Sequence, residues 1–295
     1  MRRARVKSLP LFGSIARLEN ASWLDPVVDR VRGAVNAVIR PQGLRDVLHG
    51  VPLGHPLHPM AVQVPIGAWV SAALLDLVPG QQRAARLLVG AGVISVLPAV
   101  LAGLADWSMG HEQHLRVGLV HATANVIATG CYVASLVDRC GGREARGKVF
   151  GWVGLGAVAV GGVLGGHLAY RLALGANHVE GVPHRVPPGW HGVGGIDEFA
   201  QGRLEQRMLG EVPLLVFRSG DRVEVLAEVC SHLSAPLHQG SVVGGQDPCV
   251  VCPWHQSTFS LRTGEVVHGP ATAPQPKFDT RVIRGMVEVR LPGAG

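Results

Sequence analysis

The sequence has 295 residues, of which 47% are hydrophobic and only 16% charged, and its formal net charge is +6 at pH 7. This length suffices for two domains, and the charge is distributed unevenly. Residues 1–190 contain 18 Lys and Arg against 10 Asp and Glu, whereas residues 191–295 contain 9 against 11. Because the basic part is also strongly apolar, we expect contact with anionic membrane lipid. No nucleic-acid motif is present, so nucleic acid is excluded as a partner.

Residues 1–47 are interpreted as a basic segment that contains one amphipathic helix. From Leu24 to Ile39 the apolar residues follow helical spacing, Asp25-Pro26 suits a helix start, and Pro41 marks the end. This helix would either lie on the membrane surface or pack against another element of the protein. No apolar core follows the first basic residues, so we expect no cleaved export signal.

Four apolar segments predict a multi-pass, four-helix transmembrane domain over residues 48–175. The segments are near the length needed to cross a bilayer and run approximately over 60–79, 84–106, 117–137 and 148–171. The last segment contains glycines one turn apart, Gly161/Gly165 and Gly162/Gly166, which permit close approach of a helix or a flat cofactor.

The remaining residues predict a linker followed by a small all-β domain. Residues 176–195 are rich in Gly, Pro and His, as is typical of a linker. Residues 196–295 contain strand-like runs separated by turn residues. These runs are Val212–Phe217, Arg222–Val229, Cys249–Val251, Arg281–Ile283 and Met286–Leu291.

Two short motifs in the β domain predict a metal centre. Cys230-Ser231-His232 is separated by nineteen residues from Cys252-Pro253-Trp254-His255. Two thiolates and two imidazoles in this alternating order are the ligands of a 2Fe–2S cluster in which two cysteines hold one iron and two histidines the other. Zinc is the alternative, although zinc sites usually group their cysteines on one loop and their histidines on another.

The C-terminal region resembles the Rieske ferredoxin domain, an antiparallel β-sandwich. The resemblance rests on the two ligand motifs, on Thr258-Phe259, on Thr263-Gly264 and on Gly269-Pro270-Ala271, which is similar to the loop that covers the cluster. It implies that Cys230 and Cys252 hold the inner iron, that His232 and His255 hold the outer one, and that Ser257 and Pro270 form part of the cluster environment.

Three departures from the family pattern affect these expectations. Gln256 stands where glycine commonly follows the second histidine, which is expected to alter the loop backbone. Ala235 and Trp254 stand where respiratory members have disulfide cysteines, which favours the ferredoxin type. Phe259 replaces a tyrosine whose hydroxyl is found in high-potential members, so we expect a potential below the respiratory range.

The helical region resembles a bacterial four-helix membrane domain of unknown function. The resemblance covers about residues 45–175 and is carried by Gly54-His55-Pro56-Leu57-His58-Pro59, Asp106-Trp107, the region of His121 and Asn125, and Gly165-Gly166-His167. It implies a fold without an established chemistry.

Several histidines are expected near one membrane side, and intramembrane imidazoles are usually functional. One hypothesis is that His121 and His167 ligate a b-type haem. A second is that His58, Asp106, His121 and His167 bind a metal ion or line a quinone or proton site. A third is that each histidine only forms hydrogen bonds with a neighbouring helix or with the interface.

The sequence therefore predicts a membrane-anchored electron carrier with a redox protein or a quinone as partner. Alternatives are a redox or metal sensor with a regulatory role, and an electron donor to an oxygenase. A complete oxygenase is excluded because only about forty residues follow His255, too few for an additional iron domain. The loops 80–83 and 138–147, which lie on the face opposite the Rieske domain, carry arginines, and the positive-inside rule would place that face in the cytoplasm. The missing disulfide and the basic N-terminus instead favour a cytoplasmic Rieske domain, which is the expectation adopted.

Overall fold

The computed structural model describes residues 10–293, which form two compact units. The first unit is helical and comprises residues 10–40 and 57–174, and the second comprises residues 41–56 and 175–293. The segment 41–56 thus belongs to the C-terminal unit, although more than a hundred residues of helical chain separate them in sequence.

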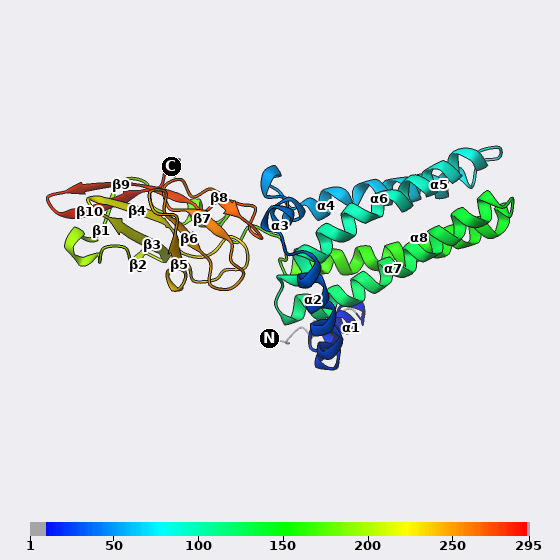
Figure 1. The fold of residues 1–295 in the computed structure, drawn as a ribbon, viewed down its shortest axis with the longest axis horizontal. Helices are drawn as coiled ribbons and strands as arrows, with labels where there is room; N and C mark the ends of the chain where they lie inside the picture. Colours follow the sequence, from blue (N-terminus) through cyan, green and yellow to red (C-terminus); the bar gives the residue numbers. More distant parts are fainter. Residues whose placement is uncertain (1–9, 294–295) are drawn as a thin grey trace, which may run out of the picture. The chain divides into compact units, whose positions relative to one another are not determined.

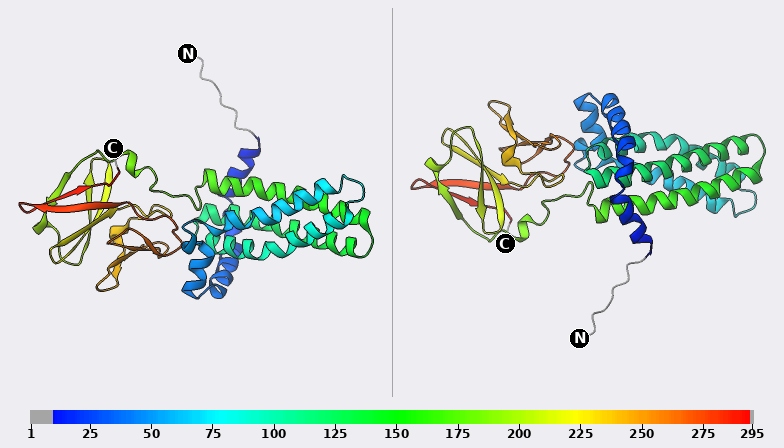
Figure 2. Two further views of the ribbon diagram at one scale, coloured as in Figure 1. Left: turned by 90° about the horizontal axis from the view of Figure 1, so that it is seen from above. Right: turned by 90° about the horizontal axis from the view of Figure 1, so that it is seen from below.

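Four helices of the first unit are long and apolar enough to cross a membrane. They are Leu57–Leu75, Gln82–Ser108, Glu112–Cys140 and Glu144–Arg171. The first comprises α4 (Leu57–Ala61) and α5 (Gln63–Leu75), and the others are α6 (Gln82–Ser108), α7 (Glu112–Cys140) and α8 (Glu144–Gly166), which ends in a π turn over His167–Arg171. Figures 1 and 2 show these helices running side by side.

The outer surfaces of these helices are apolar, which suits a lipid environment. Large side chains such as Leu87, Ile94, Leu97 and Val126 are more than 60% exposed. Inside the unit, Trp69 and Tyr132 stack with ring centres 4.0 Å apart. Exposing such large apolar side chains to water would raise the free energy of the protein, whereas the hydrocarbon tails of lipids solvate them. This surface therefore supports the prediction of a membrane domain.

The N-terminal helices α1 (Pro10–Glu19) and α2 (Asp25–Val38) lie across one end of the long helices, as Figure 1 shows in dark blue. Val28 of α2 is buried, and Arg32 donates from Nε to the Ser108 carbonyl at 2.8 Å. Asp25 accepts two hydrogen bonds of 2.7 Å from Arg116 of α7. Of the two roles considered for the amphipathic helix, packing against protein is the one that the structure supports.

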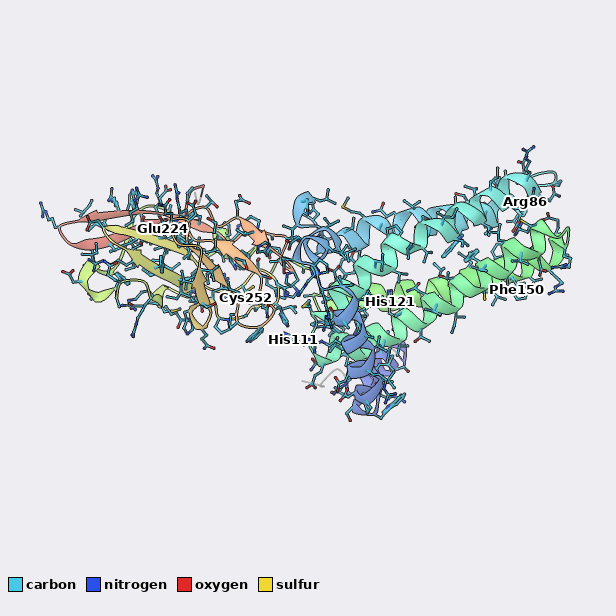
Figure 3. The ribbon with its side chains drawn as sticks, in the orientation of Figure 1. Arg86, His111, His121, Phe150, Glu224 and Cys252 are labelled. Carbon is cyan, nitrogen blue, oxygen red and sulfur yellow. The ribbon has the colours of Figure 1, made fainter. Side chains whose placement is uncertain are left out.

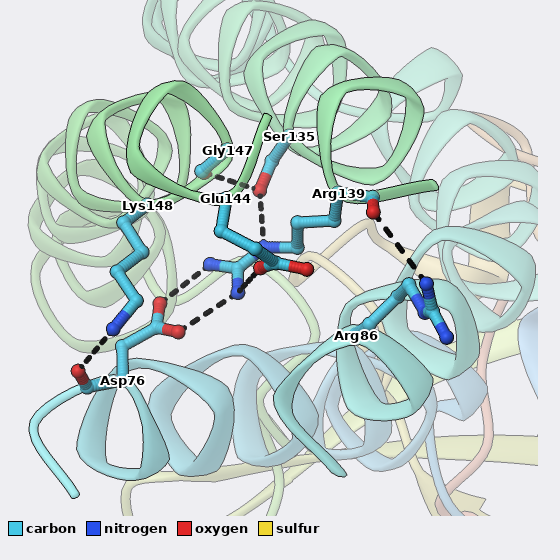
Figure 4. Close-up of polar contacts among 7 residues, drawn as sticks. All are labelled: Asp76, Arg86, Ser135, Arg139, Glu144, Gly147 and Lys148. Atoms are coloured by element: carbon cyan, nitrogen blue, oxygen red, sulfur yellow. Dashed lines mark hydrogen bonds and ion pairs between the residues drawn. The ribbon is translucent and has the colours of Figure 1, made fainter. Parts of the chain in front are cut away.

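A buried ion pair joins the helices at the end of this unit where α5 and α7 finish and α8 begins (Figure 4). Arg139 of α7 binds both carboxylate oxygens of Asp76, and the two side chains are 0% and 3% exposed. Arg139 also donates from Nε to Ser135 Oγ, whose own hydroxyl donates to the Gly147 carbonyl. Lys148 donates to the Asp76 carbonyl at 2.7 Å, so α5, α7 and α8 share one polar network.

The second unit contains two antiparallel sheets. The larger has the strand order β1-β10-β9-β4-β3-β2 and the smaller β5-β6-β7-β8. Their bounds are β1 (His191–Gly195), β2 (Leu204–Leu209), β3 (Val212–Ser219), β4 (Arg222–Ala227), β5 (Ser241–Val243), β6 (Cys249–Val251), β7 (Thr258–Ser260), β8 (Val266–His268), β9 (Lys277–Ile283) and β10 (Met286–Arg290). All ladders between these strands are antiparallel, as predicted.

Alternation along β3 divides the core of this unit into two clusters. Leu214 and Val216 point to one cluster, and Leu215 and Phe217 point to the other, as the period of two in a strand requires. The second cluster also contains Cys230, Cys252 and Phe259, so it joins the two sheets around the predicted metal ligands.

The segment expected to be a linker, residues 176–195, is packed into the first of these clusters. Val179, Val182 and Val186 are 2%, 3% and 5% exposed. The pattern of Gly and Pro predicts a linker, but the valines between them supply apolar surface that the sheet buries. The last residues of the segment form β1, which pairs with β10.

Candidate metal centre

The two loops that carry the predicted ligands have the same backbone hydrogen bonds. In the first, Cys230 N donates to Ala235 O at 2.9 Å and Ser234 N donates to Cys230 O at 3.0 Å. In the second, Cys252 N donates to Ser257 O at 2.8 Å and Gln256 N donates to Cys252 O at 3.1 Å. Each loop is therefore a tight turn that holds one cysteine at its start and one histidine within it.

Both turns require a left-handed residue, and neither uses glycine for it. Ser234 has φ +63° and Gln256 has φ +64°. Side chains other than Gly, Asn and Asp pay a steric cost in this region. Gln256 was expected to alter the loop backbone. Its φ of +64° instead lies in the left-handed region, which glycine adopts without steric cost, so the loop has this conformation with glutamine in place.

Cys230 and Cys252 are each 1% exposed, and their sulfurs lie within hydrogen-bonding distance of each other. The Cys230 thiol donates to the Cys252 sulfur, which lowers the pKa of Cys252 to about 7 against the opposing effect of burial. The same hydrogen bond and burial raise the pKa of Cys230 well above its ordinary value. Backbone N–H groups of His232 and Leu233 point at one sulfur, and those of His255 and Trp254 at the other. Such groups orient thiolates and stabilise their charge.

The two histidines lie beside each other on the same side of the unit. The ring centres of His232 and His255 are 5.0 Å apart with their planes at 89°. His232 is buried and His255 is partly exposed. Two adjacent sulfurs and two adjacent imidazoles fit the donor set of a 2Fe–2S cluster, which takes two protein ligands per iron.

A single metal ion fits this arrangement less well. Over residues 10–293, no three His, Cys, Asp or Glu side chains converge as ligands of one ion. Zinc requires three or four protein ligands around one point. The geometry therefore favours the cluster over the zinc alternative.

The loop after β8 is joined to both ligand turns. Ala271 N donates to Ser257 Oγ at 2.9 Å, and Ser231 Oγ donates to the Ala273 carbonyl at 2.7 Å. Gln275 Nε2 donates to Val229 O at 3.1 Å. Ser257 thus lies between the second ligand turn and the residue after Pro270, which agrees with a place in the cluster environment.

A helix from the N-terminal half of the chain also contacts this loop. Asp46 of α3 (Gln42–His49) lies 2.9 Å from His268 Nδ1, and its other oxygen accepts from Gly269 N at 3.0 Å. A Cβ at Gly269 would lie 3.2 Å from the Cβ of His49, which is 1% exposed. Sequence reasoning missed Asp46, because 222 residues separate it from His268 and no local pattern links them.

The candidate residues of the helical unit are arranged differently from the hypotheses. His58 and His121 face each other with ring centres 6.3 Å apart, whereas His167 lies 2.9 Å from the Glu19 carboxylate. Asp106 lies at the end of α6. Together with the absence of a three-ligand group over residues 10–293, these contacts do not support a metal site made of His58, Asp106, His121 and His167.

Known proteins match both units. Residues 189–279 match the family described as the Rieske [2Fe-2S] domain. Over 102 residues the chain is 39% identical to the anthranilate 1,2-dioxygenase ferredoxin subunit of Burkholderia cepacia, covering 35% of this chain and 92% of that protein. The chain belongs to the Rieske [2Fe-2S] domain family.

Further proteins match the Rieske domain, and a second family matches the helical unit. The Rieske domain is also 31% identical over 81 residues to the 3-phenylpropionate/cinnamic acid dioxygenase ferredoxin subunit of Escherichia coli, covering 28% of this chain and 74% of that protein. Among solved structures, the ferredoxin of carbazole 1,9a-dioxygenase from Nocardioides aromaticivorans matches with 25% identity and a TM-score of 0.33, covering 35% of this chain and 97% of that one. Residues 54–178 match the family described as predicted membrane protein (DUF2231). With the four apolar helices, this match indicates membrane association.

Proposed function

We propose that the protein is a membrane-anchored Rieske ferredoxin that carries single electrons. The observation that supports this most directly is the pair of matching turns, which bring Cys230 and Cys252 into contact and set His232 beside His255. When bound there, a 2Fe–2S cluster would supply one-electron transfer, accepting an electron from a reduced donor protein and passing it to an oxidised acceptor. The partly exposed His255 is the ligand nearest to a docking partner.

The acceptor is proposed to be an oxygenase component, a quinone in the lipid, or a cofactor of the helical unit. The names of the two ferredoxin subunits favour the first, since both serve dioxygenases. The four apolar helices favour the quinone or the cofactor of the helical unit, because they would hold the carrier at the bilayer, where lipid-soluble acceptors are found. We propose a cytoplasmic position for the Rieske domain, and a reporter fused to the C-terminus that is active only outside the cytoplasm would reverse it.

Rapid mixing of the chemically reduced full-length protein with acceptors tests the proposal. Re-oxidation of the cluster by a water-insoluble quinone in proteoliposomes, within the time of enzyme turnover, is the expected result. The matched control is the His255→Ala variant, which should lack the cluster signal. A cluster that reduces but is not re-oxidised by any quinone or by an oxygenase component would instead favour the sensor alternative.

A further inference from the structure

Two imidazoles from different membrane helices face each other inside the helical unit. His58 lies at the start of α4, and His121 lies in the third turn of α7. Their ring centres are 6.3 Å apart, and the ring planes are inclined at 81°. His121 is labelled in Figure 3, at the end of the bundle that also carries His111. Imidazoles at this depth are rare and usually serve a function.

Hydrogen bonds fix which nitrogen of each ring carries the hydrogen. His58 Nδ1 lies 2.8 Å from the Ala99 carbonyl of α6, and His121 Nδ1 lies 2.8 Å from the Gly161 carbonyl of α8. A carbonyl oxygen can only accept, so Nδ1 donates in both rings and the lone pair lies on Nε2. Metal-ligating histidines are oriented in this way, with the second nitrogen bound to a backbone carbonyl or carboxylate.

Glycines bring the helix backbones close enough to hold these rings. A Cβ at Gly103 of α6 would lie 2.7 Å from His58 Nδ1, and one at Gly165 of α8 would lie 3.1 Å from His121 Cε1. Each ring therefore packs on the backbone of a different helix, His58 on α6 and His121 on α8. The glycine pairs of α8 are expected to admit a helix or a flat cofactor. The His121 ring lies at Gly165, and Asn125 lies at Gly161.

From this juxtaposition we infer that His58 and His121 are the two axial ligands of a haem iron. Two imidazole nitrogens on opposite sides of one metal, each at about 2 Å, put the ring centres about 6 Å apart. A bare metal ion needs three or more protein ligands, and no third His, Cys, Asp or Glu joins this pair within the described part of the chain. Haem iron needs only axial ligands from the protein.

One side chain must rotate for the iron to bind His121. Asn125 Nδ2 donates to His121 Nε2 at 3.1 Å and also to the His121 carbonyl at 2.9 Å. On ligation, Asn125 loses the first hydrogen bond and keeps the second. This inference goes beyond the proposed function, because haem binding by the bundle does not depend on electron transfer by the Rieske domain.

The test is an optical spectrum of the full-length protein, produced with haem supplied and purified in detergent. We expect a Soret band with one haem per chain, and at least a tenfold loss of bound haem in both His58→Ala and His121→Ala. The matched control His167→Ala, which removes a ring bound to Glu19, should keep the haem. The EPR signal of the 2Fe–2S cluster, present in all variants, reports that the Rieske unit has folded, and thermal unfolding in detergent reports on the helical unit.

The conservative variant His58→Met separates ligation from packing. A methionine ligand keeps the haem but changes its spectrum and raises its potential, which a merely structural role for His58 would not produce. A protein that shows no Soret band with haem supplied, or alanine variants that keep the band unchanged, would overturn the inference. Loss of haem in His167→Ala with retention in His58→Ala would likewise overturn it.

Discussion

Asp46 and His268, which lie 222 residues apart in sequence, form a hydrogen bond of 2.9 Å beside the loop that joins the two ligand turns. Burial raises the pKa of Asp46. Hydrogen bonds from His268, Gly269 and Gln42 together lower it by more than burial raises it, so the net pKa lies below 3.8. A short helix located before the first membrane span is therefore built into the Rieske unit.

The variant Asp46→Asn should loosen this contact, because a carboxamide offers one acceptor oxygen in place of two. We expect a loss of about 1–3 kcal/mol in the stability of the Rieske unit, the cost of a partly buried group without its partner. Bleaching of the cluster absorbance in urea measures it, with the exposed Asp29→Asn as control. A lowered folded pKa gives stabilisation that is present above pH 3.8 and lost as the pH falls through the folded value, so the two proteins should converge on acidification.

Removal of single ligands should separate ligating from structural cysteines. Cys252→Ala is expected to abolish the cluster EPR signal, because Cys252 is one of the two sulfurs in contact. Cys249→Ala should retain it, since the Cys249 thiol donates to the Asp247 carbonyl instead. Iron content per chain, measured together with EPR, checks both. A cluster that survives in Cys252→Ala would contradict the ligand assignment.

A hydroxyl at position 259 should raise the reduction potential. Phe259 is fully buried in the core cluster that contains both cysteines. Phe259→Tyr is expected to add a hydrogen bond towards the cluster sulfurs and to raise the potential by about 60 mV, a tenfold change for one electron. Ser257→Ala should lower it similarly, and Ser260→Ala serves as control. A redox titration decides, and a wild-type potential near +300 mV, the upper limit for Rieske centres, would contradict the expected moderate value.

The ion pair between Arg139 and Asp76 should be a main support of the helical unit. Arg139→Leu leaves the Asp76 carboxylate buried without its partner, and breaking such a pair costs about 3–5 kcal/mol. Thermal unfolding in detergent should show the loss, whereas Arg83→Leu, at an exposed position nearby, should have little effect. An unchanged melting temperature for Arg139→Leu would show that Lys148 and Ser135 hold the helices without it.

Hydrophobic length predicted the membrane helices well, because four apolar runs of about twenty residues have few alternative folds. The ends were less accurate. The first span was expected over 60–79, but it runs over Leu57–Leu75, since Leu57 and His58 already begin α4. The strands β1, β2, β5, β7 and β8 were not predicted. Three of the five residues of β1 are glycine, three of the six residues of β2 are charged or amide side chains, and β5, β7 and β8 each have only three residues.

The sequence by itself determined the ligand set of the metal centre and the division into apolar and β-rich parts. Both are local properties, carried by residues a few positions apart or by the composition of a segment. Only the tertiary structure decided that His121 faces His58 rather than His167, that residues 176–195 pack as core, and that Asp46 contacts Gly269. These are contacts between segments distant in the chain, and they depend on how whole elements pack, which no spacing within a single segment encodes.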